Sequence, residues 1–185
     1  MNKEQHWRGL VKRFEATTDD LGQPLDTGIL EAVVALNALG FEMTSSCEGH
    51  DEGSYAPYVD IAINTPADEK ERVFEALRHA ETDEELRAAN DLMAQINVYY
   101  LQVRHRLTDL LIGFYAVRHV PYDHLLTLHP RRDVFGLVEE LRLQCVGTED
   151  LDLSEAAERA VKLNAYQGEI MEFAAFLKEK YFKED

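Results

Sequence analysis

Apolar residues recur every three or four positions in five stretches of the chain, which is the spacing of an amphipathic helix. Asp26 precedes the second stretch as a predicted N-cap, and Gly40 ends it. Thr65 is the predicted N-cap of the third stretch, with Pro66 at the first helical position. The pattern therefore predicts helices at residues 3–16, 26–40, 65–80, 82–117 and 152–181.

The last two of these helices carry an apolar seam with alternating three- and four-residue spacing. Thr82 and Glu85 form a capping box at the start of the first, and its seam runs from Leu86 to Val117. Asp152 is the predicted N-cap of the second. We expect the two seams to pack on each other within the chain, and packing across a homodimer is the alternative.

Four shorter stretches alternate between apolar and polar residues, which is typical of strands. The first becomes small and polar as it ends, and a loop joins it to the second, so we expect these two to form a hairpin. The predicted strands are residues 41–47, 58–64, 125–129 and 135–146. The fold class is therefore α+β: a small, mostly antiparallel sheet backed by long amphipathic helices, in a single domain that spans residues 1–185.

The chain is strongly acidic, with 35 Asp and Glu against 19 Lys and Arg and a net charge of −16. Phosphate contacts supply much of the affinity for nucleic acid, so this charge argues against nucleic acid as a partner, and equally against an anionic membrane surface. The sequence has no apolar stretch of membrane-spanning length and no recognisable signal peptide. We therefore expect a cytoplasmic protein whose two cysteines are thiols.

Basic side chains gather between Arg104 and Arg132, in a segment that holds five arginines and four of the seven histidines. Such a segment can bind a small anion through charge-assisted hydrogen bonds. The alternative is that its side chains pair with the surplus carboxylates elsewhere in the chain.

The segment from Thr44 to His50, Thr-Ser-Ser-Cys-Glu-Gly-His, gathers reactive side chains at the end of a predicted strand. Cys47 and His50 have the Cys-x-x-His spacing that lets a thiolate and an imidazole reach one zinc ion. A zinc site needs further donors, and the candidates are Asp51, Asp60, His124 and His129. Asp60 ranks first, because strand alternation places it opposite the apolar face of its own strand.

The same pair of residues supports a thiol-dependent reaction as well. A neighbouring imidazolium can lower the pKa of Cys47 and make its thiolate a nucleophile. Glu48 or Asp51 would then orient His50. The alternative without chemistry is a small buried cysteine at a strand end, followed by a polar turn. Cys145 lies in an apolar strand and is expected in the core.

A third use of the segment is the binding of a small-molecule anion. The hydroxyls of Ser45 and Ser46 and the backbone N–H groups of the following turn are donors that can cradle one. Arg131 or Arg132, after another predicted strand, would close over it. Together with Asp60, these residues form the predicted ligand site.

Several runs of the chain resemble a family of uncharacterised bacterial proteins that share Leu-Asn-x-Leu-Gly, Ser-Cys-Glu-Gly-His and Pro-x-Val elements. The matching runs are residues 25–29, 33–41, 44–50 and 57–61. The likeness extends through residues 126–131 and the C-terminal helix, so it covers most of the chain. The resemblance implies relatives without implying an activity.

A shorter likeness is to the Thr-x-Ser-Cys-Ser-Gly-Arg element of the wybutosine-synthesis methyltransferase, which acts on tRNA. The matching positions are Thr44, Ser46, Cys47 and Gly49. Glu48 and His50 stand in place of the serine and the arginine, so this chain has one positive charge fewer and one negative charge more. The likeness implies a similar local fold around the cysteine.

These observations favour three functions, in decreasing order. The first is a metal- or thiol-dependent enzyme acting on a small molecule, with its site at Cys47 and His50 and zinc as the cofactor. The second is a non-catalytic interaction or regulatory protein that uses the long helices. The third is a protein of tRNA modification.

Overall fold

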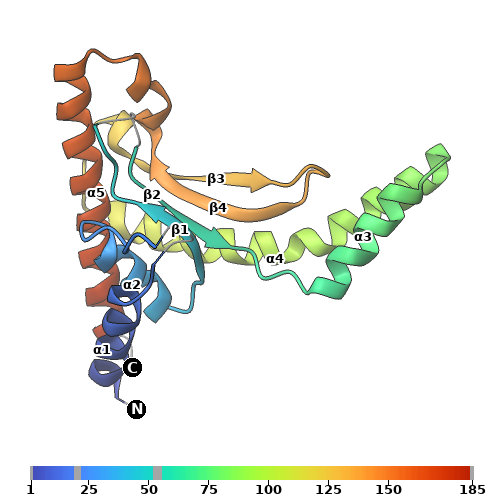
Figure 1. The fold of residues 1–185 in the computed structure, drawn as a ribbon, viewed down its shortest axis with the longest axis horizontal. Coiled ribbons are helices and arrows are strands. Elements are labelled where there is room, and N and C mark those ends of the chain that lie inside the picture. Colours follow the sequence, from blue (N-terminus) through green and yellow to red (C-terminus); the bar gives the residue numbers. More distant parts are fainter. Residues whose placement is uncertain (1, 19–21, 52–55, 184–185) are drawn as a thin grey trace.

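A four-stranded antiparallel sheet with the strand order β1-β2-β4-β3 organises the chain (Figure 1). The computed structural model describes residues 2–18, 22–51 and 56–183. The strands are β1 (Met43–Cys47), β2 (Tyr58–Ala62), β3 (Leu126–Arg132) and β4 (Val138–Cys145). β1 and β2 pair antiparallel as the predicted hairpin, and residues 52–55 of its loop lie outside the described ranges. The predicted α+β fold is confirmed.

Five α-helices follow the predicted ranges closely, because each has the spacing that buries one face. They are α1 (Lys3–Glu15), α2 (Leu30–Ala38), α3 (Ala67–His79), α4 (Asp83–Tyr115) and α5 (Ala156–Lys183). The sequence analysis did not predict two short 3-10 helices, η1 (Tyr122–His124) and η2 (Val146–Leu153). None of the described helices combines the length and the hydropathy that crossing a membrane requires.

Three helix starts differ from the prediction. α2 begins at Leu30, so Asp26 is not its N-cap, and its carboxylate accepts a backbone N–H beyond β1 instead. The N-cap of α3 is Pro66 and not Thr65. Asp152 lies inside η2, before α5 begins. At Asp26 the cause is visible, because its contact with the Glu48 N–H competes with capping of the helix.

The sheet has one apolar and one polar face. Val59 and Ile61 of β2 and Leu141 and Leu143 of β4 are fully buried and belong to the main core, with apolar residues of α2, α4 and α5. The alternate positions of the same strands include Asp60, which lies on the opposite face. A strand has a period of two, which is why this difference was readable from the sequence.

The two long helices meet near one end of α4. Phe114 of α4 contacts Phe173 and Phe176 of α5, with ring centroids 5.2 and 5.5 Å apart. From there α4 runs away from α5, and α5 packs mainly against α2 (Figure 1). The prediction that the two seams pack along each other therefore holds at this contact and is wrong for most of their length.

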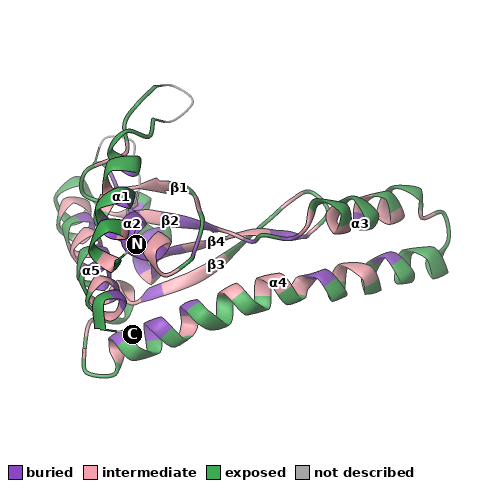
Figure 2. Cartoon of the chain, turned by 90° about the horizontal axis from the view of Figure 1, so that it is seen from below, coloured by how far each residue is buried: buried purple, intermediate pink, exposed green. Residues whose placement is uncertain are grey.

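The N-terminal half of α4 forms a helical hairpin with α3 that extends away from the rest of the chain (Figure 2). The predicted capping box is present, since Glu85 N donates to Thr82 Oγ1 at 3.3 Å and Thr82 N donates to Glu85 Oε2 at 3.0 Å. A small second core of Val73, Ile96 and Leu137 joins this hairpin to the start of β4.

Some apolar side chains of α4 that lie outside the predicted seam are exposed. Val98, Leu101 and Ile112 are 44%, 56% and 64% exposed, whereas Leu107 and Phe114 of the predicted seam are buried within the chain. The middle of the seam is therefore satisfied by packing within the chain, whereas its two ends, Leu86 and Val117, are exposed. A homodimer that packs through the predicted seam stays a prediction.

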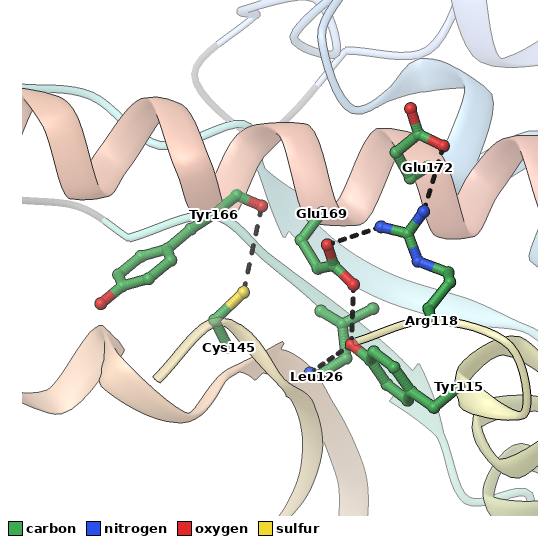
Figure 3. Close-up of polar contacts among 7 residues, drawn as sticks. All are labelled: Tyr115, Arg118, Leu126, Cys145, Tyr166, Glu169 and Glu172. Atoms are coloured by element: carbon green, nitrogen blue, oxygen red, sulfur yellow. Dashed lines mark hydrogen bonds and ion pairs between the residues drawn. The ribbon is translucent and has the colours of Figure 1, made fainter. Parts of the chain in front are cut away.

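A buried carboxylate connects α4, α5 and β3 (Figure 3). Glu169 of α5 accepts hydrogen bonds from the Tyr115 hydroxyl at 3.0 Å and from Arg118 Nη2 at 2.9 Å. The Tyr115 oxygen accepts the backbone N–H of Leu126 at 2.8 Å. Burial raises the pKa of Tyr115, which keeps its proton available for Glu169. This network sets the position of β3 relative to both helices.

Candidate metal centre

Asp26, Cys47 and His50 gather where β1 ends. One ligand atom of each residue, a carboxylate oxygen, the thiol sulfur and an imidazole nitrogen, lies within 4.8 Å of the other two. Asp26 Oδ2 and His50 Nε2 are 3.4 Å apart. The structure therefore brings the predicted Cys-x-x-His pair together and adds a carboxylate from a separate loop.

A reciprocal pair of hydrogen bonds holds the loop before α2 against the turn after β1. The backbone N–H of Glu48 donates to Asp26 Oδ2 at 3.1 Å, and the N–H of Gly28 donates to Glu48 Oε2 at 2.6 Å. A Cβ at position 28 would lie 2.5 Å from Glu48 Oε2, so a side chain there would displace the Glu48 carboxylate from this hydrogen bond. The contacts orient the Asp26 carboxylate and direct the Glu48 side chain to Gly28.

Gly49 makes the turn between Cys47 and His50. Its φ of +89° lies in the left-handed region that favours glycine. The Gly49 N–H donates to Cys47 Sγ at 3.3 Å, and its carbonyl oxygen accepts from Gln167 Nε2 of α5 at 3.1 Å. Gln167 of α5 therefore stabilises the turn that carries the Cys47 and His50 side chains.

Asp60, ranked first among the additional donors, lies on the polar face of β2 and is 2% exposed. Its carboxylate accepts Arg142 Nε at 2.8 Å, Arg142 Nη2 at 2.6 Å and Ser45 Oγ at 2.8 Å. The Arg142 guanidinium lies 3.6 Å from the centroid of the Tyr58 ring. Asp60 therefore forms a buried ion pair with Arg142. It lies beside Asp26, Cys47 and His50, which we call the metal group, and is not one of these three ligands.

The remaining predicted donors lie elsewhere in the described chain. Asp51 Oδ1 is 3.3 Å from Arg159 Nε of α5. His124 in η1 meets the ring of Tyr166 edge-on, with centroids 5.6 Å apart. His129 lies on β3, at the opposite edge of the sheet from β1. Among the described residues, the gathered ligands are therefore Asp26, Cys47 and His50.

Arg131 and Arg132 are not brought to Cys47. They end β3, which the strand order places three strands from β1. Arg131 pairs with Glu140, whereas Cys47 pairs with Tyr58 at the other end of the sheet. Three strand spacings alone amount to about 14 Å. The predicted closure of Arg131 over an anion at Cys47 is therefore not formed.

A cavity of about 580 Å³ opens beside the metal group, between α1, the loop before α2 and β1. Asp26 and His50 line it, together with the predicted ligand residues Ser45 and Ser46. Its volume is within the usual range for sites that bind small molecules. The cavity thus connects the metal group with a space that a ligand can enter.

Asp26 is the site residue that the sequence analysis missed. It precedes an apolar helical run and so fits the N-cap pattern, but three residues separate it from the start of α2 at Leu30. The signal against a cap was Gly28 two positions later, since Asp-x-Gly is typical of a turn. Its contact with His50 depends on packing between separate loops and could not be read from spacing.

The Cys47 thiol keeps its proton at neutral pH. Burial raises its pKa above the ordinary value of 9.0, the Gly49 N–H lowers it, and the carboxylates of Asp26 and Glu48 raise it again. A free thiol in this setting is a poor nucleophile. A metal ion displaces the proton of a coordinating thiol, so the setting favours a ligand over a nucleophile.

We expect alkylation of Cys47 by iodoacetamide to be slow at pH 7 and to speed up as the pH rises through and beyond 9, because the thiolate is the reactive form. Mass spectrometry of a Cys145→Ala variant between about pH 6 and pH 11 measures the rate at Cys47 alone. Cys145 itself is fully buried, and burial raises its pKa to about 12. A rate already maximal at pH 7 would contradict this assignment.

Comparison of the chain with profiles of known protein families, with curated proteins and with solved structures finds no match. The two sequence resemblances therefore stay predictions.

Proposed function

We propose that Asp26, Cys47 and His50 bind one divalent transition metal ion, with zinc as the best fit, and that the protein is a metal-dependent enzyme acting on a small molecule in the adjoining cavity. The observation that carries this proposal is the convergence of three ligand atoms from two separate segments within 4.8 Å. Carboxylate, thiolate and imidazole are the side chains that zinc binds in proteins.

The number of ligands that gather among the described residues, three, supports a catalytic rather than a structural site. Structural zinc sites are closed by four protein ligands, whereas catalytic sites use three and leave a position for water or substrate. With bonds of about 2.0–2.3 Å, ligand atoms on tetrahedral zinc lie roughly 3.3–3.8 Å apart. Asp26 and His50 already have this spacing at 3.4 Å, and the sulfur of Cys47 has to approach by roughly 1.3 Å at most.

The surroundings of the three residues also support metal binding. The Glu48 N–H donates a hydrogen bond to the Asp26 carboxylate, and the Gly49 N–H donates one to the Cys47 sulfur. Metal sites use such contacts to orient their ligands. Zinc lowers the pKa of a bound water to about 7 and so supplies a nucleophile at neutral pH. The reaction class supported best is therefore hydrolysis of a small molecule.

Elemental mass spectrometry of untagged protein, loaded with zinc and then dialysed, tests the proposal. We expect about one zinc per chain in the wild type and loss of that zinc in Cys47→Ala, His50→Ala and Asp26→Asn, because two remaining ligands do not retain the ion. Circular dichroism of each variant establishes that it is folded.

Matched controls change the same residue types outside the group. Cys145→Ala, His129→Ala and Asp51→Asn are expected to keep the wild-type zinc content, since none of these side chains is among the three gathered ligands. A wild-type protein without zinc after loading, or equal zinc content in all six variants, would contradict the proposed centre.

A further inference from the structure

The cavity beside the metal group has an apolar and a hydroxyl-bearing side. The apolar side includes Phe14, Val33 and Met43, and the hydroxyl-bearing side includes Thr44, Ser45 and Ser46. Among the lining residues that the structure describes there is no lysine or arginine, and the ionisable side chains are Asp26 and His50. A small molecule with an apolar body and a polar end matches such a cavity.

The Ser45 hydroxyl has one hydrogen-bonding role in this arrangement. Ser45 Oγ lies 2.8 Å from Asp60 Oδ2, and Asp60 is the ion-pair partner of Arg142. An ionised carboxylate only accepts hydrogen bonds, so the proton of Ser45 is directed to Asp60. Ser45 is exposed and lines the cavity. Its hydroxyl oxygen therefore acts toward a ligand as a hydrogen-bond acceptor.

The proposed metal site carries almost no net charge once it is filled. The Asp26 carboxylate and the Cys47 thiolate together offset the two positive charges of the ion. No basic side chain among the described lining residues is left to balance a negatively charged ligand. An unpaired charge is costly to bring out of water, so an anion is disfavoured in this cavity.

We infer that the cavity selects neutral or positively charged small molecules that present an N–H or O–H donor to Ser45 Oγ next to the group that reaches the metal ion. This inference rests on the proposed metal centre, which orients the ligand. An amide meets both requirements, with its carbonyl oxygen at the ion and its N–H at Ser45. Asp60 and Arg142 are positioning residues, because they contact Ser45 and each other.

Cobalt-loaded protein tests the need for a donor, because the absorption of Co²⁺ reports thiolate ligation and changes when a ligand enters the open position. Imidazole and 1-methylimidazole both bind metals through a ring nitrogen, but only imidazole has an N–H. We expect imidazole to bind about three- to tenfold more tightly, the effect of one hydrogen bond. Ser45→Ala should make the two affinities equal, and Ser154→Ala, outside the cavity, should preserve the ratio.

The same titration tests the charge preference with three imidazoles that differ in their side group. 4-Methylimidazole is neutral, histamine is positively charged and imidazole-4-acetate is negatively charged. At low salt we expect imidazole-4-acetate to bind at least about fivefold more weakly than 4-methylimidazole, and histamine to bind as tightly or more tightly.

The outcomes separate the inference from the proposed function. Absence of a thiolate-to-cobalt absorption band before any probe is added overturns the metal centre and this inference with it. If the band is present, equal affinities for imidazole and 1-methylimidazole in the wild type overturn the inference alone. Tighter binding of imidazole-4-acetate, or a preference for imidazole that persists in Ser45→Ala, also overturns it.

Discussion

Replacing Arg142 by alanine is expected to lower the free energy of unfolding by about 3–5 kcal/mol, because it leaves a buried carboxylate without its partner. Asp60 is 2% exposed. The Asp60 carboxylate accepts three side-chain hydrogen bonds, and Arg142 donates two of them. Urea-induced unfolding at neutral pH, followed by circular dichroism, measures the change.

Two further variants distinguish burial from charge pairing in general. Arg8→Ala removes an arginine from an ion pair with Glu4, whose side chains are 77% and 67% exposed, and is expected to cost less than about 1 kcal/mol. Combining Arg142→Met with Asp60→Leu should recover most of the stability, since no buried charge remains. A cost below about 1 kcal/mol for Arg142→Ala would show that water or another cation replaces the guanidinium.

Gly49→Ala is expected to lower the free energy of unfolding by about 3 kcal/mol and to abolish zinc binding. The backbone there has a φ of +89°, and an added Cβ would lie 2.7 Å from Leu163 Cδ1 and 2.9 Å from the backbone nitrogen of Pro57. Relieving these contacts moves the turn that presents Cys47 and His50. Urea unfolding and zinc content measured on the same preparation test both effects.

Gly136→Ala is the matched control for this substitution. Gly136 has nearly the same φ, +90°, but an added Cβ would meet no atom within 4 Å. We expect Gly136→Ala to lower the free energy of unfolding by about 1–2 kcal/mol, which is the cost of a side chain on left-handed backbone. The variant should retain zinc. Equal stability losses in the two variants would mean that the turn at Gly49 adapts to a side chain, and the steric account of that turn would be wrong.

Local patterns were sufficient to find the five α-helices and four strands described above and the fold class. The capping box of Thr82 and Glu85 joins residues three positions apart, and the alternation of Asp60 with Val59 and Ile61 follows from the period of a strand. Such features depend on neighbours within one turn or one pleat. The predicted start of α2 was wrong, because the Asp26 carboxylate accepts the Glu48 N–H and does not cap the helix.

Within the site, the sequence by itself determined the Cys-x-x-His spacing of Cys47 and His50, which lets both side chains reach one ion when Gly49 forms the turn between them. The tertiary structure alone decided that Asp26 joins them, that Arg142 neutralises Asp60 from 82 residues away, and that strand order keeps Arg131 distant. The physical reason is that charges attract without regard to sequence separation. Which of the 19 bases meets which of the 35 acids is settled only when strands pair and helices pack.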